Sequence, residues 1–198
     1  MGLDRSALLG AIERLHEEMP THFDTLNAAD GKLGDGDLGI TMTRGMAEIT
    51  AVSDDLPEDL GLAMLKCSQA FTKSSGSSYG TLMALGMMAI AKQIKGQTVV
   101  EPSELTALVA VARDQIQTRG KAEIGGKTVL DSLDAIAKQT SGMTDLEDIR
   151  TAAVVAVVKA LSPFCDKPPP PGGGRMFCGE KIGPYDPRLL GVEFIVFA

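Results

Sequence analysis

The sequence predicts an all-α protein built from antiparallel amphipathic helices. Trp is absent and aromatic residues make up only 4% of the 198 residues, so Ala, Leu, Val, Ile and ten Met supply most of the apolar content. Such a composition favours helix over sheet, because aromatic and β-branched residues are the strand formers. Apolar residues also recur at spacings of three and four along most of the chain, without a repeated strand–helix–strand pattern. Helices joined by short connections favour an antiparallel arrangement.

The first helix has clear signals at both ends. Its apolar face is formed by Leu8, Ile12, Leu15 and Met19. Asp4 is suited to cap its N-terminus, and Pro20 is expected to end it. A short second helix is expected over residues 23–29.

Three helices are expected in the middle of the chain. Asp37 begins one of them after a glycine-rich interruption, and its apolar face continues through Met42, Met46 and Ile49. Another is expected over residues 57–73, with one face formed by Leu60, Met64, Cys67 and Phe71. Residues 81–94 are apolar nearly all round, which predicts a central helix whose Met83, Met87 and Met88 belong to the core.

The next two helices lie on either side of a glycine-containing connection. Ser103 is suited to cap a helix with an apolar face of Leu105, Leu108, Ala112 and Ile116. Gly120 stands where a left-handed residue is expected after that helix. Thr128 is suited to cap the following helix, marked by Val129, Leu133 and Ile136.

The pattern changes after the last helix, which we expect to begin at a capping box of Thr144 and Glu147 and to end near Leu161. Four prolines and three glycines at residues 168–174 cannot form helix, so residues 163–175 are expected to be irregular. Residues 191–198 prefer strand. The whole chain, residues 1–198, suits a single domain.

Charge and composition exclude several functions. The formal net charge is −7, which disfavours nucleic acid and implies that phosphate would be handled through a cation. The three cysteines form no CxxC pair, so neither a zinc site nor a disulfide framework is indicated. There is no signal-peptide pattern and no apolar run of about 18 residues, so we expect a cytoplasmic protein that does not span a membrane.

The strongest site signal is a cluster of three carboxylates, Asp30, Asp35 and Asp37, interspersed with glycines. Carboxylates this close repel one another, so a cation is expected to hold them together, and Mg²⁺ prefers such oxygen ligands. The spacing excludes an EF-hand, because Gly39 stands at the fifth position from Asp35 and Met46 at the twelfth. The alternative is a polar loop in which Asp37 only caps a helix.

Two further segments are candidates for phosphate binding. Residues 72–81 combine small hydroxyl side chains with glycine before a helix, which suits a phosphate cradle or an ordinary interhelical loop. Residues 125–128 imitate the end of a Walker A loop, but Gly120 is one place too early and no strand precedes it, so a P-loop is excluded. His16 and His22 are isolated and are interpreted as surface residues.

Taken in order, these motifs resemble the nucleotide-binding subunit of dihydroxyacetone kinases. That family has an aspartate triad followed by Met and Arg-Gly, a Ser-Gly-x3-Gly-Thr segment, an Arg-Gly-Lys-Ala segment ending in Lys-Thr, and late Gly-Arg, Gly-Glu, Ile-Gly and Asp-Pro elements. The corresponding residues here are Asp30, Asp35, Asp37, Met42, Arg44-Gly45, Ser75-Gly76, Gly80-Thr81, residues 119–128, Gly174-Arg175, Gly179-Glu180, Ile182-Gly183 and Asp186-Pro187.

The resemblance implies a closed barrel of about eight antiparallel helices with a nucleotide at one end. It implies that Asp30, Asp35 and Asp37 hold two magnesium ions that bridge the phosphates of ADP or ATP. The residues implied on the phosphate side are Leu38, Gly39, Ile40, Thr41, Ser74 and Ser75. Those implied on the nucleoside side are Gly120, Val129, Arg175, Asp186, Pro187 and Arg188.

By the same resemblance, the chain is one subunit of a dihydroxyacetone-type kinase. A separate ketone-binding subunit would hold the acceptor, which is dihydroxyacetone or a related triose or tetrose. The phosphate donor is either ATP or a phosphocarrier protein of a phosphotransferase system. Leu38 and Gly126 stand where many members have His and Asp, which leaves the identity of the sugar open. The alternatives are a non-catalytic nucleotide-sensing module that binds a regulatory protein, and a structural helical protein without a ligand.

Overall fold

The computed structural model describes residues 2–31, 35–74, 76–120, 123–126 and 128–161. Within these ranges the chain forms eight α-helices: α1 (Arg5–Glu18), α2 (Phe23–Asp30), α3 (Leu38–Thr50), α4 (Leu60–Ser74), α5 (Ser78–Gln93), α6 (Leu105–Gly120), α7 (Val129–Gln139) and α8 (Leu146–Leu161). Short 3₁₀ turns occur at Met19–His22, Ser53–Asp55 and Pro102–Glu104. Two short strands, β1 (Leu3–Asp4) and β2 (Val99–Val100), pair antiparallel with Leu3 opposite Val100.

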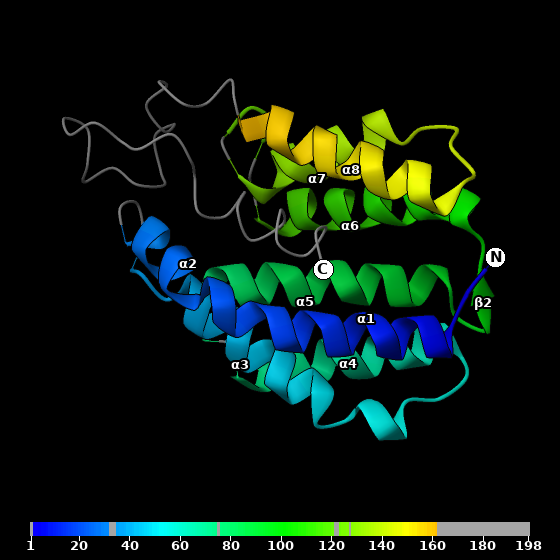
Figure 1. Ribbon diagram of the computed structural model, residues 1–198, viewed down its shortest axis with the longest axis horizontal. Coiled ribbons are helices and arrows are strands. Elements are labelled where there is room, and N and C mark those ends of the chain that lie inside the picture. Colours follow the sequence, from blue (N-terminus) through cyan, green and yellow to red (C-terminus); the bar gives the residue numbers. More distant parts are fainter. Residues whose placement is uncertain (1, 32–34, 75, 121–122, 127, 162–198) are drawn as a thin grey trace.

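Helices that follow one another from α3 to α8 pack as neighbours and run in alternating directions (Figure 1). The α5 helix contacts α3, α4 and α6, so it has the central position predicted from its composition. Met83 and Met87 pack against the core as expected, and Met88 is partly buried. All eight helices contribute to one apolar core, which includes Ile12, Leu26, Met42, Phe71, Tyr79, Ile116, Leu130 and Val157. The all-α prediction is confirmed.

Several predicted helix ends are also confirmed. The Asp4 side chain accepts a hydrogen bond from Ala7 N at 3.0 Å and caps α1. That helix ends at Glu18, and Pro20 lies in the 3₁₀ turn that follows. Thr128 caps α7 by accepting from Leu130 N at 3.3 Å.

Two predicted starts were wrong by three residues, because a different side chain supplies the cap. The α4 helix begins at Leu60 rather than at residue 57, since Asp59 accepts from Leu62 N and from Gly96 N, each at 3.0 Å. The α5 helix begins at Ser78 rather than at residue 81, since Ser77 Oγ accepts from Gly80 N at 3.1 Å. The Asp59 cap thus starts α4 three residues later than the apolar pattern indicates, whereas the Ser77 cap extends α5 by about one turn at its start.

The caps predicted for α6 and α8 were also wrong. Ser103 lies inside the 3₁₀ turn before α6, where Glu101 and Glu104 form the capping box. At α8, Asp145 replaces Thr144 and accepts from Glu147 N and Asp148 N at 3.0 Å.

The prediction of a left-handed residue at Gly120 is corrected as well. Gly120 is the last residue of α6, and the described glycines with positive φ are Gly36, Gly96, Gly125 and Gly142. A Cβ atom at Gly120 would lie 3.1 Å from Leu82 Cδ2, so its small size serves packing of α6 against α5.

The remaining predictions concern the chain ends and the surface. Residues 163–175 and 191–198 lie outside the described residues. In the described part of the chain, the helices are too short or too polar to cross a bilayer. His16 and His22 are partly exposed, and His22 Nε2 lies 3.7 Å from Glu18 Oε2, which agrees with their interpretation as surface residues.

Candidate metal and nucleotide site

The described helix ends that carry predicted site residues lie at one end of the helix bundle, opposite the N-terminus (Figure 1). The C-terminal ends of α2, α4 and α6 and the N-terminal ends of α3, α5 and α7 all reach this end. The alternating directions of the helices therefore bring three separate stretches of sequence into one region.

The three aspartates converge at this end. Asp30 is in the last turn of α2 and is 6% exposed, Asp37 directly precedes α3, and Asp35 is exposed between them. Each offers a carboxylate oxygen, and these three oxygens lie within 4.8 Å of one another. The convergence predicted from the sequence is thus present in the fold.

The carboxylate of Asp30 organises the loop around itself. Its Oδ2 atom accepts hydrogen bonds from Gly36 N at 3.0 Å and from Asp37 N at 3.1 Å. Gly36 has a φ of +77°, a conformation that residues with a side chain rarely adopt. Gly36 and Asp37 are therefore held at the end of α2 through one oxygen of Asp30, Oδ2.

The cluster has the charge and chemistry of a site for a divalent cation. Partial burial raises the pKa of Asp37, and the neighbouring charges of Asp35 and Asp30 raise it further. Three carboxylates that disfavour one another's ionised form are stabilised by a cation placed between them. Oxygen ligands of this kind fit Mg²⁺, which is usually held by one or two carboxylates together with water and substrate phosphates.

Asp37 does not cap α3 with its side chain. The amide oxygen of Asn27, on α2, performs that role: Oδ1 accepts from Gly39 N at 2.8 Å and from Ile40 N at 3.3 Å. The cap that the alternative interpretation assigned to the Asp37 side chain is therefore wrong. Sequence reasoning missed Asn27, although its position three residues before Asp30 places both side chains on one face of α2.

The start of α3 is also joined to the start of α5. Thr41 Oγ1 donates to Ser77 Oγ at 2.9 Å, so a hydroxyl from residues 72–81 lies beside the first turn of α3. Leu38 is 2% exposed and packs in the core, which leaves its backbone rather than its side chain for a ligand. Ser74 Oγ donates to Phe71 O at 3.3 Å. Ser75 lies outside the described residues.

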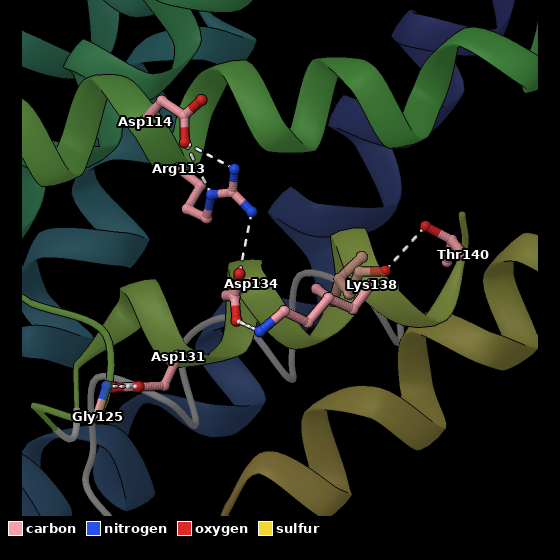
Figure 2. Close-up of polar contacts among 8 residues, drawn as sticks. Arg113, Asp114, Gly125, Asp131, Asp134, Lys138 and Thr140 are labelled. Carbon is pink, nitrogen blue, oxygen red and sulfur yellow. Dashed lines mark hydrogen bonds and ion pairs between the residues drawn. The ribbon is translucent and has the colours of Figure 1, made fainter. Parts of the chain in front are cut away.

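The connection between α6 and α7 is held by Asp131, which is 7% exposed (Figure 2). Its carboxylate accepts from Gly125 N and, at 2.7 Å, from Thr128 N. Val129 is buried beside it, and Gly120 ends α6 on the other side of the connection. The predicted nucleoside contacts at Arg175, Asp186, Pro187 and Arg188 lie outside the described residues.

A second carboxylate of α7 fastens the two helices together (Figure 2). Asp134 Oδ1 lies 3.0 Å from Arg113 Nη1 of α6, and its Oδ2 lies 2.6 Å from Lys138 Nζ. Arg113 Nη2 also lies 2.8 Å from Asp114 Oδ1. The Arg113–Asp134 pair joins α7 to α6, whereas the other two pairs lie within one helix each.

Replacing Asp131 with alanine is expected to lower the free energy of unfolding by about 1–3 kcal/mol, because two partly buried backbone N–H groups lose a charged acceptor. Asp145→Ala is the matched control, since Asp145 also accepts from two backbone N–H groups at a helix start. Urea unfolding should show a loss in both variants, smaller for Asp145, whose N–H partners are exposed, whereas calorimetry with ADP and Mg²⁺ should show weaker binding in the Asp131 variant alone. Equal ADP affinity in the two variants would exclude the α6–α7 connection from the site.

Comparison with known proteins shows similarity to a protein family and to several of its characterised relatives. Residues 32–196 match the family model described as the DAK2 domain. The chain is 30% identical to the ADP-binding subunit DhaL of PEP-dependent dihydroxyacetone kinase 2 from Listeria innocua, over 55% of this chain and 52% of that protein. It is 26% identical to the corresponding subunit from Escherichia coli, over 66% of this chain and 63% of that protein. Human triokinase/FMN cyclase is 33% identical over 62% of this chain and 21% of its own length.

The fold has solved counterparts. The dihydroxyacetone kinase of Citrobacter freundii, in its native form, matches 97% of this chain and 33% of its own chain with a TM-score of 0.76 and 21% identity. The same kinase in complex with AMP-PNP and Mg²⁺ matches with the same TM-score and 20% identity. At this level of identity the likeness shows the fold. The sequence matches span between about half and two thirds of the length of the bacterial subunits.

Proposed function

This chain belongs to the DAK2-domain family, and from that membership we propose that it binds Mg²⁺ together with ADP or ATP as the nucleotide-binding subunit of a dihydroxyacetone-type kinase. The observation that carries the proposal is the convergence of Asp30, Asp35 and Asp37 within 4.8 Å at one end of the bundle. The names of the bacterial relatives, which are ADP-binding subunits of dihydroxyacetone kinases, support the choice of nucleotide and of reaction.

In this proposal the three carboxylates hold the metal, with two ions as the expected number. Bound Mg²⁺ would neutralise phosphate charge and stabilise the charge that develops during phosphoryl transfer. Asp30 is already oriented by the N–H groups of Gly36 and Asp37, so its position does not depend on the ion. No side chain of the triad has to act as a nucleophile.

The polyphosphate is proposed to lie along the start of α3, at residues 38–41, and beside Ser74, Ser75 and Ser77. The hydroxyls of Thr41 and Ser77 already contact each other there. The Gly39 and Ile40 amides donate to Asn27, so recognition of phosphate would depend on the cation and the hydroxyls rather than on these two amides. The nucleoside is proposed to lie toward Gly120, Val129 and the C-terminal residues Arg175 and 186–188.

The proposal also includes the phosphate acceptor and a partner subunit. A separate ketone-binding subunit would hold dihydroxyacetone or a related triose or tetrose, and either ATP or a phosphocarrier protein would supply the phosphate. The bacterial relatives are named as subunits, which supports this division of labour. We place the complex in the cytoplasm, where nucleotides are available, and propose that residues 1–198 form one domain.

The proposal predicts that the isolated chain binds ADP only with Mg²⁺ and does not phosphorylate dihydroxyacetone by itself. Calorimetry with ADP, in Mg²⁺ and then in EDTA, measures the first part. A coupled assay with and without a ketone-binding subunit measures the second. Sustained turnover by this chain alone would refute the subunit role. Binding without turnover in the presence of the partner would favour a nucleotide-sensing module, and no binding in Mg²⁺ would refute the nucleotide site itself.

A further inference from the structure

We propose that Asn27 is a positioning residue for the carboxylate cluster: it holds the start of α3 against α2 so that Asp37 faces Asp30 before a cation binds. This inference rests on the metal site of the proposed function. It assigns a role to a residue outside the aspartate motif, and it explains how the mutually repelling carboxylates of Asp30 and Asp37 stay together in the metal-free protein.

Two side chains of α2 accept hydrogen bonds from the residues on either side of the start of α3. Asn27 and Asp30 lie one helical turn apart, on the same face of α2. Asp30 Oδ2 accepts from Gly36 N and Asp37 N, and Asn27 Oδ1 accepts from Gly39 N and Ile40 N. Asp37 is thus held on its N-terminal side by Asp30 and on its C-terminal side by Asn27.

The intervening residue, Leu38, completes the restraint. Its side chain is 2% exposed and packs in the apolar core, so the chain is also fixed between the two groups of hydrogen bonds. With its backbone fixed on both sides, Asp37 has little freedom except rotation of its own side chain. Restraint of this kind lowers the entropy that a metal site loses when a cation binds.

Gly39 makes the close approach of the two helices possible. A Cβ atom at this position would overlap the carbonyl oxygen of Phe23 and would lie 2.8 Å from Asn27 Oδ1. The first turn of α3 therefore rests directly on the backbone of α2. A side chain at residue 39 would push α3 away and lengthen both hydrogen bonds to Asn27.

The amide of Asn27 suits this position because it supplies an acceptor without a charge. A helix N-terminus accepts Asn and Asp almost equally well as caps. An aspartate here would add a fourth negative charge to a cluster in which the pKa of Asp37 is already raised by burial and by its neighbours. Asn27 orders the site without increasing the repulsion among the carboxylates in the absence of metal.

The test compares Asn27→Ala with Asp59→Ala, using Mn²⁺ alone as the probe. Asp59 is a matched control, because it also accepts from two backbone N–H groups, at the start of α4 and at Gly96. Both variants should be less stable in urea unfolding. Loss of a residue that orients metal ligands typically costs about 10–100-fold in metal affinity, so Asn27→Ala should weaken Mn²⁺ binding by that factor. Asp59→Ala should bind Mn²⁺ as the unaltered protein does.

Two further measurements separate positioning from general stability. Asn27→Asp keeps the acceptor oxygen, so this variant should bind Mn²⁺ at least as tightly as the unaltered protein does. Amide hydrogen exchange in the metal-free protein should be faster at Gly36 and Asp37 in Asn27→Ala, although their own acceptor is Asp30, and unchanged there in Asp59→Ala. If Asn27→Ala does not fold, Asn27→Gln, which displaces the amide by one methylene, takes its place.

The outcomes distinguish this inference from the proposed function. Unaltered Mn²⁺ affinity in Asn27→Ala, together with a loss of stability equal to that of the control, would overturn the positioning role and leave Asn27 as a simple helix cap. Failure of the unaltered protein to bind Mn²⁺ would overturn the metal site of the proposed function. In that case the exchange measurement still decides the positioning role, because unchanged exchange at Gly36 and Asp37 would contradict it.

Discussion

Replacing Asp35 with alanine is expected to lower the affinity for ADP in the presence of Mg²⁺ by at least about a hundredfold. Residues that only orient metal ligands cost about 10–100-fold when they are removed, and Asp35 is proposed to be a ligand itself. Its side chain is exposed, so the substitution should leave the fold and its stability nearly unchanged. The result would therefore report on the site and not on unfolding.

The matched control is Asp54→Ala, which removes an exposed carboxylate from the 3₁₀ turn after α3, at the other end of that helix. Both variants change the net charge equally, so a general electrostatic effect would appear in both. Calorimetric titration with ADP at saturating Mg²⁺ gives the affinities. If Asp35→Ala binds ADP as tightly as Asp54→Ala does, the assignment of the metal site to the triad is wrong.

The largest expected effect on stability is at Phe71. Replacement by alanine should lower the free energy of unfolding by about 3–5 kcal/mol, the usual cost of truncating a buried aromatic side chain. Phe71 is 2% exposed, and its ring lies over Gly45, where a Cβ atom would overlap the ring. The α3 and α4 helices thus pack through a glycine on one and an aromatic ring on the other, and urea unfolding measures the cost of disturbing this contact.

The same contact predicts a non-additive pair of substitutions. Gly45→Ala should lower stability by about 1–3 kcal/mol, because an added methyl group overfills the space. Gly10→Ala in α1 is the control, since a Cβ atom there would be 3.4 Å from the end of the Arg14 side chain and helix propensity should raise stability by about 0.5–1 kcal/mol. Combining Gly45→Ala with Phe71→Leu should cost less than the sum of the two single changes. Additive losses would show that Gly45 and Phe71 do not share one packing space.

Apolar periodicity predicted the helices well because each buries one face in the shared core. It predicted their ends less well, because several side chains near a helix start can accept the free N–H groups. At α4 the choice depends on Asp59, which also reaches Gly96, 37 residues away. At α8 the choice between Thr144 and Asp145 depends on local geometry that spacing does not determine.

In the site, too, residues that lie close together in the sequence could be predicted, whereas contacts that depend on helix packing could not. The aspartate triad was predictable because its members lie within eight residues, so a single loop brings them together. Asn27 was not, because its partners Gly39 and Ile40 are 12 and 13 residues away and depend on how α3 rests on α2. Gly45 appeared in the sequence only as part of a motif, and its packing against Phe71 explains why a glycine is needed there.

The occupied amides at the start of α3 influence the order in which ligands enter. A metal-free polyphosphate that reaches this end of the bundle meets the negative charges of Asp30, Asp35 and Asp37, while the Gly39 and Ile40 amides already donate to Asn27. Repulsion between like charges opposes its entry. If the proposed site is correct, the cation would therefore arrive first or together with the polyphosphate, and the rate of capture would follow the concentration of the metal–nucleotide complex rather than that of total nucleotide.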